Sequence, residues 1–397
     1  MTGSQGKAMA VVKRVGVIGG GQLAWMMAGG AEKLGVELIV QTPSRSDPAV
    51  AIATEVILAS VGDASATAEL AAQCDVITFE NEFVDLPALS LLEQQGLCFR
   101  PSLSALEPLL DKYNQRSYLQ SLGLPVPRFM PLHPEQMPEI SLSPSAPSGK
   151  LEFPLVLKTR RHGYDGQGTF IIKDRAALQA TLAELSHVPL LLEEFVPFER
   201  ELAAIAARSV KGEIAIFPVV ETQQVEQVCR RVFAPATISR TVQAEVEAIA
   251  HTLLNHLQVV GVFGIELFLT PDGRVLVNEI APRVHNSGHF TLDACETSQF
   301  EQHLRAVCGL PLGSPAMKCP AAVMVNLLGY EHSIRDYAAQ RQQLAAIPQA
   351  RVHWYGKTES RPGRKLGHVT VLLEEPGDDQ RERAIATELE AIWYGRE

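Results

Sequence analysis

Residues 262–281 read VFGIELFLTPDGRVLVNEIA, and this stretch decides the fold of the central part of the chain. Two apolar runs flank Pro271-Asp272-Gly273, which is typical of a tight turn, so the pattern predicts a β-hairpin. Glu266 interrupts the first run and Glu279 the second, and a buried carboxylate needs a cation or another partner. With Asn278 beside it, the acid pair suits Mg²⁺, which takes oxygen ligands and shares them with nucleotide phosphates. The alternative is a half-exposed hairpin whose acids face solvent.

A second informative stretch, residues 158–169, reads KTRRHGYDGQGT. An expected strand ends at Lys158, and a loop with three glycines follows it. The lysine can meet phosphate oxygens while the glycine amides fold over the same phosphates. The loop is not a Walker A loop, because no Gly-Lys-Ser/Thr closes it. A plain basic hairpin would not need three glycines, so the stretch predicts phosphate binding.

Two further strand ends carry acidic residues. Glu193-Glu194-Phe195-Val196 closes an apolar run and fits a hinge whose backbone meets an adenine ring while a carboxylate meets a ribose hydroxyl. Residues 78–82 (TFENE) end another strand, at the edge where open parallel sheets bind ligands. For both segments the alternative is a strand end in water, and neither decides the function alone.

The N-terminal region alternates strands and helices. RVGVI at 14–18 precedes three glycines and a helical pattern through Leu34. Further strands are expected at 36–40 and 75–79, with a helix at 64–74 between them. This alternation predicts a Rossmann-like parallel sheet with helices on its faces.

The glycine turn of this region, Gly19-x-Gly21-x-x-Ala24, resembles a dinucleotide-binding turn. A nicotinamide enzyme should carry an acid about 20 residues further on, whereas residues 40–42 read VQT, which argues against NAD. The glycines then form a tight strand–helix turn, or Gln22 and Leu23 line a substrate pocket.

The rest of the chain mixes strands with isolated helices, which predicts an α+β unit. Residues 131–150 hold five prolines and no apolar periodicity, so we expect a surface loop or linker there. From about residue 318 the pattern changes again, towards a further small unit. Helices are expected at 101–123, 175–187, 241–257 and 332–345, and strands at 155–158, 169–173, 190–196, 201–209, 213–220, 351–355 and 367–374.

Basic and imidazole side chains gather in two places. Residues 282–289 (PRVHNSGH) directly follow the hairpin, and Arg283 is suited to stabilise charge on a transferring phosphoryl group. Four cations lie within residues 357–365 of an otherwise acidic chain, which favours an anionic ligand such as a sugar phosphate. The alternative for the second group is a solvated basic turn.

The bulk composition excludes several classes of protein. The chain has 397 residues, enough for two or three domains, with 46% hydrophobic and 20% charged residues. A formal net charge of −10 argues against nucleic acid as the partner. The six cysteines form no Cys-x-x-Cys pair, so a zinc or redox motif is not expected. Neither a signal peptide nor a membrane helix is recognised, and we expect a cytoplasmic protein.

Taken in order, the motifs resemble the ATP-grasp superfamily and, within it, the N5-carboxyaminoimidazole ribonucleotide synthase family. The stretches that carry this resemblance span nearly the whole chain: GGGQLAWM (19–26), TFENEF (78–83), KTRRHGYDGQG (158–168), NEIAPRVHNSGH (278–289), HWYGK (353–357) and RPGRKLGHV (361–369). The resemblance implies a pre-ATP-grasp domain at 1–112, an ATP-grasp domain of two subdomains at 113–316, and a small C-terminal domain at 317–397.

The resemblance also implies an activity, a ligase reaction of purine biosynthesis. ATP would phosphorylate bicarbonate to carboxyphosphate, whose carboxyl group or CO₂ then passes to the amine of 5-aminoimidazole ribonucleotide. It implies Mg²⁺, with Mn²⁺ as a substitute, only small-molecule substrates, and a homodimer. The alternative is a sister ATP-grasp enzyme such as the formate-dependent glycinamide ribonucleotide transformylase.

The motifs carry site residues over from the family. The metal ligands would be Glu266 and Glu279, and the catalytic set Asp165, Arg283 and Lys357, with Asp165 as the first candidate to deprotonate the amine. ATP would meet Lys112, Lys158, Gly163, Tyr164, Asp165, Gly166, Gln167, Gly168, Thr169, Glu193, Glu194, Phe195, Val196, Glu201, Gln224, Asn278 and Glu279. The substrates would meet Tyr164, Asp165, Arg283, His285, Asn286, Ser287, Lys357, Arg364 and Lys365, and, by analogy with a sister enzyme, Gln22, Leu23 and Glu80.

Two positions depart from the family pattern. Gln224 stands where the family usually has a histidine that touches the nucleotide, and His162 stands where the lid loop usually has glycine. Gln224 therefore either replaces that contact or loses it.

Overall fold

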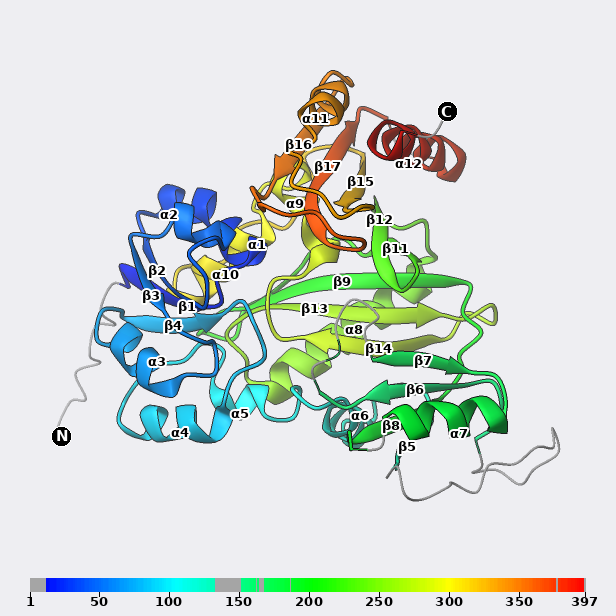
Figure 1. The fold of residues 1–397 in the computed structure, drawn as a ribbon, viewed down its shortest axis with the longest axis horizontal. Coiled ribbons are helices and arrows are strands. Elements are labelled where there is room, and N and C mark those ends of the chain that lie inside the picture. The colour runs from blue at the N-terminus through cyan, green and yellow to red at the C-terminus, as the bar shows by residue number, and fades with distance from the viewer. Residues whose placement is uncertain are drawn as a thin grey trace, which may run out of the picture.

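A computed structural model of the chain describes residues 12–132, 151–161, 163, 168–185, 187–375 and 378–395. Figure 1 shows an N-terminal sheet at one end, a large sheet across the middle, a small sheet beside it, and the C-terminal helices at the top. Among the residues that the structure describes, every helix is too short or too polar to cross a membrane.

The N-terminal region is built on a four-stranded parallel sheet of order β3-β2-β1-β4. Its strands are β1 (Arg14–Ile18), β2 (Glu37–Thr42), β3 (Glu55–Leu58) and β4 (Val76–Phe79). The predicted parallel sheet is therefore confirmed. The sequence pattern missed β3, because this four-residue edge strand exposes two of its side chains and shows no long apolar run.

Short helices cover this sheet. The helix expected to run from the glycines through Leu34 is two helices, interrupted at Met26 and Met27. The second of them ends at Gly35, whose φ of 64° suits glycine at a helix C-terminus. The elements are α1 (Gln22–Trp25), α2 (Ala28–Leu34), the 3₁₀ turn η1 (Pro48–Ala51), α3 (Ala64–Ala71), α4 (Leu86–Gln94) and α5 (Leu103–Leu106).

A small antiparallel sheet of order β5-β8-β6-β7 follows. It consists of β5 (Phe129–Leu132), β6 (Leu155–Thr159), β7 (Thr169–Ile172) and β8 (Leu190–Glu194), with α6 (Lys112–Ser121) before it. Helix α7 (Arg175–Glu184) buries Leu178 and Leu182 against β6 and β8. Residues 131 and 132 of the expected proline-rich loop belong to β5, and 133–150 lie outside the described residues.

The largest element is a nine-stranded sheet of order β14-β13-β9-β11-β12-β15-β17-β16, with β10 also paired to β9. Helix α8 (Arg240–Leu257) packs its buried leucines and valines on one face. The strands are β9 (Arg200–Arg208), β10 (Ile214–Ile216), β11 (Val220–Val225), β12 (Val228–Ala234), β13 (Gly261–Leu269), β14 (Val275–Ala281), β15 (Ala321–Leu328), β16 (Ala350–Trp354) and β17 (Lys365–Leu373).

The C-terminal region continues this sheet. Strand β12 pairs with β15, so one sheet runs across the expected domain boundary at 316/317. Helix α11 (Ala338–Ala345) and helix α12 (Asp379–Tyr394) cover the added strands. Trp393 is fully buried there, and its Nε1 donates to the carbonyl of Leu328 at 2.8 Å.

Helix α10 (Gln299–Val307), which follows the short η2 (Asn286–Gly288) and α9 (Thr291–Ala294), joins the N-terminal sheet to the large one. His303 Nε2 hydrogen-bonds the hydroxyl of Thr78 at 2.7 Å, and its Nδ1 accepts from the amide of Val262 at 3.1 Å. Burial lowers the pKa of His303 to about 4, so the ring is neutral. This contact fixes the end of β4 against the central hairpin.

Candidate active site

The predicted hairpin is confirmed as β13 and β14, with Glu266 directly opposite Glu279. The register shifts after Glu266, which leaves Asn278 as an unpaired extra residue on β14. Neighbours on a strand normally face opposite sides, and such a bulge re-aims a side chain. Asn278 and Glu279 both contact groups of the same cleft as a result.

The two acids are less buried than the sequence pattern suggested, with 28% of the Glu266 side chain and 40% of the Glu279 side chain exposed. Both side chains are therefore only partly buried, and Glu279 lines an open cleft. Burial and the charge of Glu279 raise the pKa of Glu266 to about 7. Burial acts the same way on Glu279, but Lys112 and Lys158 outweigh it and lower the pKa of that acid.

Two lysines hold these acids and their neighbours. Lys112 Nζ lies 2.6 Å from Glu279 Oε1. Lys158 Nζ lies 2.7 Å from Glu193 Oε2 and donates to Asn278 Oδ1 at 3.2 Å. The amide of Asn278 in turn donates to Glu266 Oε2 at 3.4 Å. The predicted phosphate contacts and the predicted metal ligands therefore form one connected group.

The carboxylate of Glu193 is committed within the protein. It is buried and also pairs with Arg116. Burial would raise its pKa, but Arg116 and Lys158 outweigh burial and lower the pKa to about 2. The sequence analysis expected one carboxylate of this segment to meet a ribose hydroxyl. In the structure the Glu193 carboxylate is instead paired within the protein, and Glu194 pairs with Arg128 at 2.6 Å.

Glu201 and Gln224 lie on the neighbouring strands β9 and β11. Burial and the charge of Glu266 raise the pKa of Glu201 to about 7. Gln224 sits at a register shift between β11 and β12 and is half-buried. Among the described residues, no side-chain hydrogen bond joins Gln224 to a neighbour.

An open cleft lies beside Lys112 and Glu279. Four segments meet there: the loop after β4, the start of α6, the loop after β6, and β14. The lining residues are Glu82, Phe83, Leu109, Leu110, Lys112, Gln115, Arg160, Arg161, Gly163, Glu279 and Ile280.

Only part of the predicted lid loop is described. Tyr164, Asp165, Gly166 and Gln167, and the departure His162, lie outside the described residues. Gly163 lines the cleft, and Thr169 begins β7. Gly168 has a φ of +78°, and a Cβ there would collide with the side chain of Thr159, so glycine is required.

The N-terminal glycine turn is filled by the protein itself. The Glu80 carboxylate lies against Gly19 and Gly21, where a Cβ would collide with it, and accepts from the amides of Gly21 and Leu23. A dinucleotide phosphate would occupy this place at a helix start. In this chain the Glu80 carboxylate occupies that place. Gln22 and Leu23 begin α1 beside Glu80, and Leu23 is buried.

Arg283 joins the loop after β4 to the turn after β14. Its Nη2 donates to Glu82 Oε2 at 3.1 Å, and its Nε lies 3.1 Å from the other oxygen of Glu82. Burial raises the pKa of Glu80 to about 7, although Arg283 and then Lys357 act to lower it. Arg283 and Lys357 therefore both lie near Glu80.

The three residues after this turn have different settings. His285 Nε2 lies 3.4 Å from Glu266 Oε1, so it faces the hairpin. Asn286 is buried and exchanges two amide hydrogen bonds with Asn326, at 2.9 and 2.8 Å. Ser287 is buried, and its hydroxyl hydrogen-bonds His285 Nδ1 at 2.9 Å. Asn286 and Ser287 therefore make their side-chain hydrogen bonds within the protein.

The C-terminal cations differ in what they act on. The charge of Lys365 acts to lower the pKa of Glu266, and the charge of Lys357 acts to lower that of Glu80. The guanidinium of Arg364 donates instead to the carbonyl of Glu359 at 2.9 Å, within its own loop.

Family models match three successive parts of the chain. The ribonucleotide synthetase preATP-grasp domain matches residues 12–108, the ATP-grasp domain 117–300, and the phosphoribosylaminoimidazole carboxylase C-terminal domain 322–382. The N5-carboxyaminoimidazole ribonucleotide synthase of Synechococcus elongatus is 57% identical over 389 residues, which cover 97% of each chain. The chain belongs to the N5-carboxyaminoimidazole ribonucleotide synthase family. The Bacillus subtilis synthase is 38% identical over 366 residues, which cover 92% of each chain.

Solved structures of this synthase family share the whole architecture. One in complex with ADP matches with a TM-score of 0.86 at 34% identity, covering 98% of this chain and 100% of that one. The Aspergillus clavatus synthase, crystallised with ADP and 5-aminoimidazole ribonucleotide, matches with a TM-score of 0.85 at 31% identity, covering 96% and 98%. The predicted family and the three-part fold class are thereby confirmed.

Several residues that hold the synthase site together carried no sequence signal. Gln115 clamps the edge strand β14, because its Nε2 donates to the Ile280 carbonyl at 3.0 Å and its Oε1 accepts from the Ile280 amide at 2.9 Å. Gln299 likewise holds both backbone groups of His285. Arg116 pairs with Glu193 from a distant part of the chain. These three residues lie in polar or mixed stretches, and only their burial in the fold distinguishes them.

Proposed function

We propose that this chain carboxylates 5-aminoimidazole ribonucleotide with bicarbonate and ATP, giving N5-carboxyaminoimidazole ribonucleotide, ADP and phosphate. The observation that carries the proposal is the likeness to synthases of that name over nearly the whole chain. The facing acids Glu266 and Glu279 of this chain agree with it. The synthase from Aspergillus clavatus binds ADP and 5-aminoimidazole ribonucleotide, and another structure of that synthase holds ATP.

The reaction has two steps. A bicarbonate oxygen attacks the γ-phosphorus, the bond to ADP breaks, and carboxyphosphate forms. The amine nitrogen of the ribonucleotide then takes the carboxyl group or released CO₂, phosphate leaves, and the amine loses a proton. Catalysis of such phosphoryl transfer rests on positioning and on stabilising negative charge.

In this proposal Lys112 and Lys158 bind the nucleotide phosphates. In the structure their ammonium groups lie against Glu279 and Glu193, and Lys158 also bonds Asn278. Phosphate oxygens are equivalent partners for an ammonium group, so the lysines can exchange one anion for another without leaving the cleft. Within the described residues the amide of Val196 donates no hydrogen bond, which leaves it for an adenine nitrogen.

Glu266 and Glu279 would hold the divalent metal, with Asn278 beside them, and Mg²⁺ or Mn²⁺ both suit oxygen ligands. The residues fit a cation, because burial and then the charge of Glu279 disfavour the charged form of Glu266, and a bound cation would favour it. When bound, such an ion neutralises charge on the nucleotide phosphates.

The ribonucleotide would lie between the N-terminal region, near Glu80, and the C-terminal residues Lys357 and Lys365. Arg283, held by Glu82, and Lys357 act on the pKa of Glu80, and Lys365 acts on that of Glu266. These cations suit a phosphorylated substrate and the anionic carboxyphosphate. Asp165 is our candidate to accept the amine proton.

An ADP-release assay with each substrate omitted in turn tests the proposal. We expect release to need bicarbonate, divalent metal and 5-aminoimidazole ribonucleotide together. Full activity without bicarbonate would refute it, and replacement of bicarbonate by formate with glycinamide ribonucleotide would establish the sister transformylase instead. A nucleotide sensor would bind ATP tightly without substrate-stimulated turnover.

We also propose a homodimer in the cytoplasm, on the family resemblance alone, with no nucleic acid or membrane partner. The domain limits 1–112, 113–316 and 317–397 are proposed on the same basis. Sedimentation of the purified protein checks the dimer, and a monomer at all concentrations would overturn it.

A further inference from the structure

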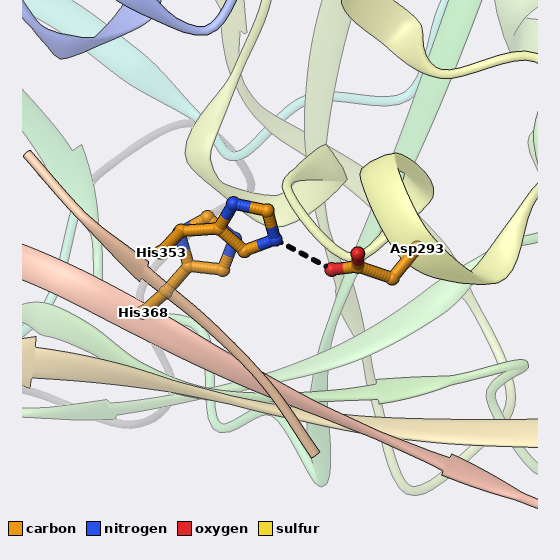
Figure 2. Close-up of side chains that lie close together, drawn as sticks. All are labelled: Asp293, His353 and His368. Carbon is orange, nitrogen blue, oxygen red and sulfur yellow. Dashed lines mark hydrogen bonds and ion pairs between the residues drawn. The ribbon is translucent and has the colours of Figure 1, made fainter. Parts of the chain in front are cut away.

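A group of imidazoles lies beside the site, between α9 and the strands β16 and β17 (Figure 2). His353 and His368 are directly opposite in the antiparallel register, and their rings stack with centroids 4.6 Å apart and planes inclined by 14°. His353 Nε2 donates to Asp293 Oδ2 at 2.8 Å. The proposed reaction uses none of these three residues.

Ligand atoms of Asp293, His353 and His368 lie within 4.8 Å of one another, which raises the question of a second metal site. The ring stack argues against it. An imidazole lone pair lies in its ring plane, so an ion about 2.1 Å from both nitrogens must lie close to both planes. Two nearly parallel rings, one above the other, offer no such point. The cluster is therefore arranged for contact between its rings.

The contacts continue from the histidines to a substrate residue. His368 Nδ1 and the hydroxyl of Tyr355 share a hydrogen bond of 2.8 Å, and both side chains are buried. Lys357 Nζ lies 5.8 Å from the centroid of the Tyr355 ring, within the range of a cation–π contact. One column of contacts thus links Asp293 to Lys357.

The far side of Tyr355 meets the N-terminal region. Its ring and that of Trp25, at the end of α1, pack edge to face with centroids 6.0 Å apart. Helix α1 begins at the glycine turn that Glu80 fills, and the charge of Lys357 acts on Glu80. The column therefore ends where the C-terminal region meets helix α1 of the N-terminal region.

We propose that Asp293 is a positioning residue for ribonucleotide binding, which holds Lys357 in place through His353, His368 and Tyr355. Its carboxylate fixes the Nε2–H of His353 and so the plane of that ring. The stacked ring of His368 then keeps its Nδ1 on the Tyr355 hydroxyl, and the tyrosine ring supports the lysine. This inference rests on the proposed function, because Lys357 acts there on the ribonucleotide.

Steady-state kinetics of Asp293→Ala test the inference. We expect the KM for the ribonucleotide to rise about tenfold, which corresponds to about 1.4 kcal/mol. The kcat and the KM for ATP should stay within about twofold of wild type, since the hairpin is untouched. In a Lys357→Ala background the same substitution should add little, because the column then has nothing to position.

Two variants separate positioning from general damage. Asp293→Asn keeps an acceptor for His353 Nε2 and should restore most of the affinity. Asp336→Ala is the matched control, because it removes an exposed carboxylate that pairs with Arg341 in the same region, and it should leave every constant unchanged. If Asp293→Ala does not fold, His353→Gln interrupts the same column and should show the same selective rise in KM.

Equal losses in kcat and in both KM values, or effects of Asp293→Ala and Lys357→Ala that simply multiply, would overturn the inference. Wild-type protein that never carboxylates the ribonucleotide would instead refute the proposed function, so the two failures are distinguishable.

Discussion

The hairpin of β13 and β14 and the histidine cluster of Asp293, His353 and His368 both gather side chains that bind metals. At the hairpin, two acids face each other in the strand register, and Glu279 pairs with Lys112, whose ammonium group can exchange this acid for a nucleotide phosphate. In the cluster, rings lie face to face, and His353 Nε2 and His368 Nδ1 each bond a neighbouring protein group. Closeness of the side chains does not decide which group binds a metal. The direction of the lone pairs and the charge of the surrounding residues decide it. We therefore expect the hairpin to determine kcat and the contacts from Asp293 to Lys357 to determine affinity for the ribonucleotide.

Glu279→Gln should have the largest effect. The variant keeps the shape of the side chain but removes a charged ligand, so kcat should fall on the order of 100-fold or more while the protein stays folded. An ADP-release assay measures kcat, and a thermal melt shows whether the variant is folded. Glu199→Gln, at a half-exposed glutamate near Arg200, is the matched control and should turn over normally. Wild-type turnover in Glu279→Gln would refute the metal assignment and erase the contrast with the cluster.

Lys357→Ala should act on affinity instead. Loss of the ammonium group at the end of the column should raise the KM for the ribonucleotide about tenfold or more, with a smaller change in kcat. Initial rates at varied ribonucleotide concentration measure it. An unchanged KM would remove Lys357 from the substrate site and leave the column without a function.

Lys112→Met should change two affinities in opposite directions. Lys112 Nζ lies 2.6 Å from Glu279 Oε1, so without nucleotide it neutralises an acid that the metal needs. Its removal should strengthen binding of free Mn²⁺ about tenfold, measured by electron paramagnetic resonance, and weaken binding of ATP. Lys33→Met breaks a comparable pair with Glu301, 2.8 Å apart, and should change neither. Parallel losses of Mn²⁺ and ATP binding would show that Lys112 only supports the fold.

Glu266→Gln should have the smallest effect, a pH-dependent gain in stability without ligands. The pKa of Glu266 is raised to about 7, against about 4.3 in an unfolded chain. The stability from this bound proton is fully present below about pH 4.3 and is lost as the pH rises through about 7. Because glutamine mimics the protonated acid, the Tm difference between variant and wild type should grow from about pH 5 to about pH 8. A difference that shrinks over this range would contradict the repulsion across the hairpin.

Much of the fold was predictable because local patterns specify it. The turn at 271–273 sets the hairpin, and the alternation in residues 14–79 sets the parallel sheet. Contacts between distant segments were not predictable. Nothing local shows that Glu80 fills the glycine turn, or that His303 bonds Thr78 across 225 positions. Strand β12 was missed for a related reason. Its Cys-Arg-Arg segment interrupts the apolar run, and its strand conformation depends on pairing with the distant strand β15.

The site residues follow the same division. The sequence and the resemblance pointed to Glu266, Glu279 and the lysines, because charged residues in apolar runs stand out. They also placed Asn286 and Ser287 at the substrates, whereas in the structure the side chains of both bond other protein groups. Arg364 was expected at the substrate, whereas its guanidinium bonds its own loop.

The most direct test of the account follows one oxygen atom. With bicarbonate labelled in heavy oxygen, attack on the γ-phosphorus makes one labelled oxygen the bridge of carboxyphosphate, and it leaves with the phosphate. Phosphorus NMR of the product should therefore show one labelled oxygen per phosphate released, in a reaction that needs the ribonucleotide. Unlabelled phosphate from an active enzyme would contradict the phosphorylation of bicarbonate at this hairpin.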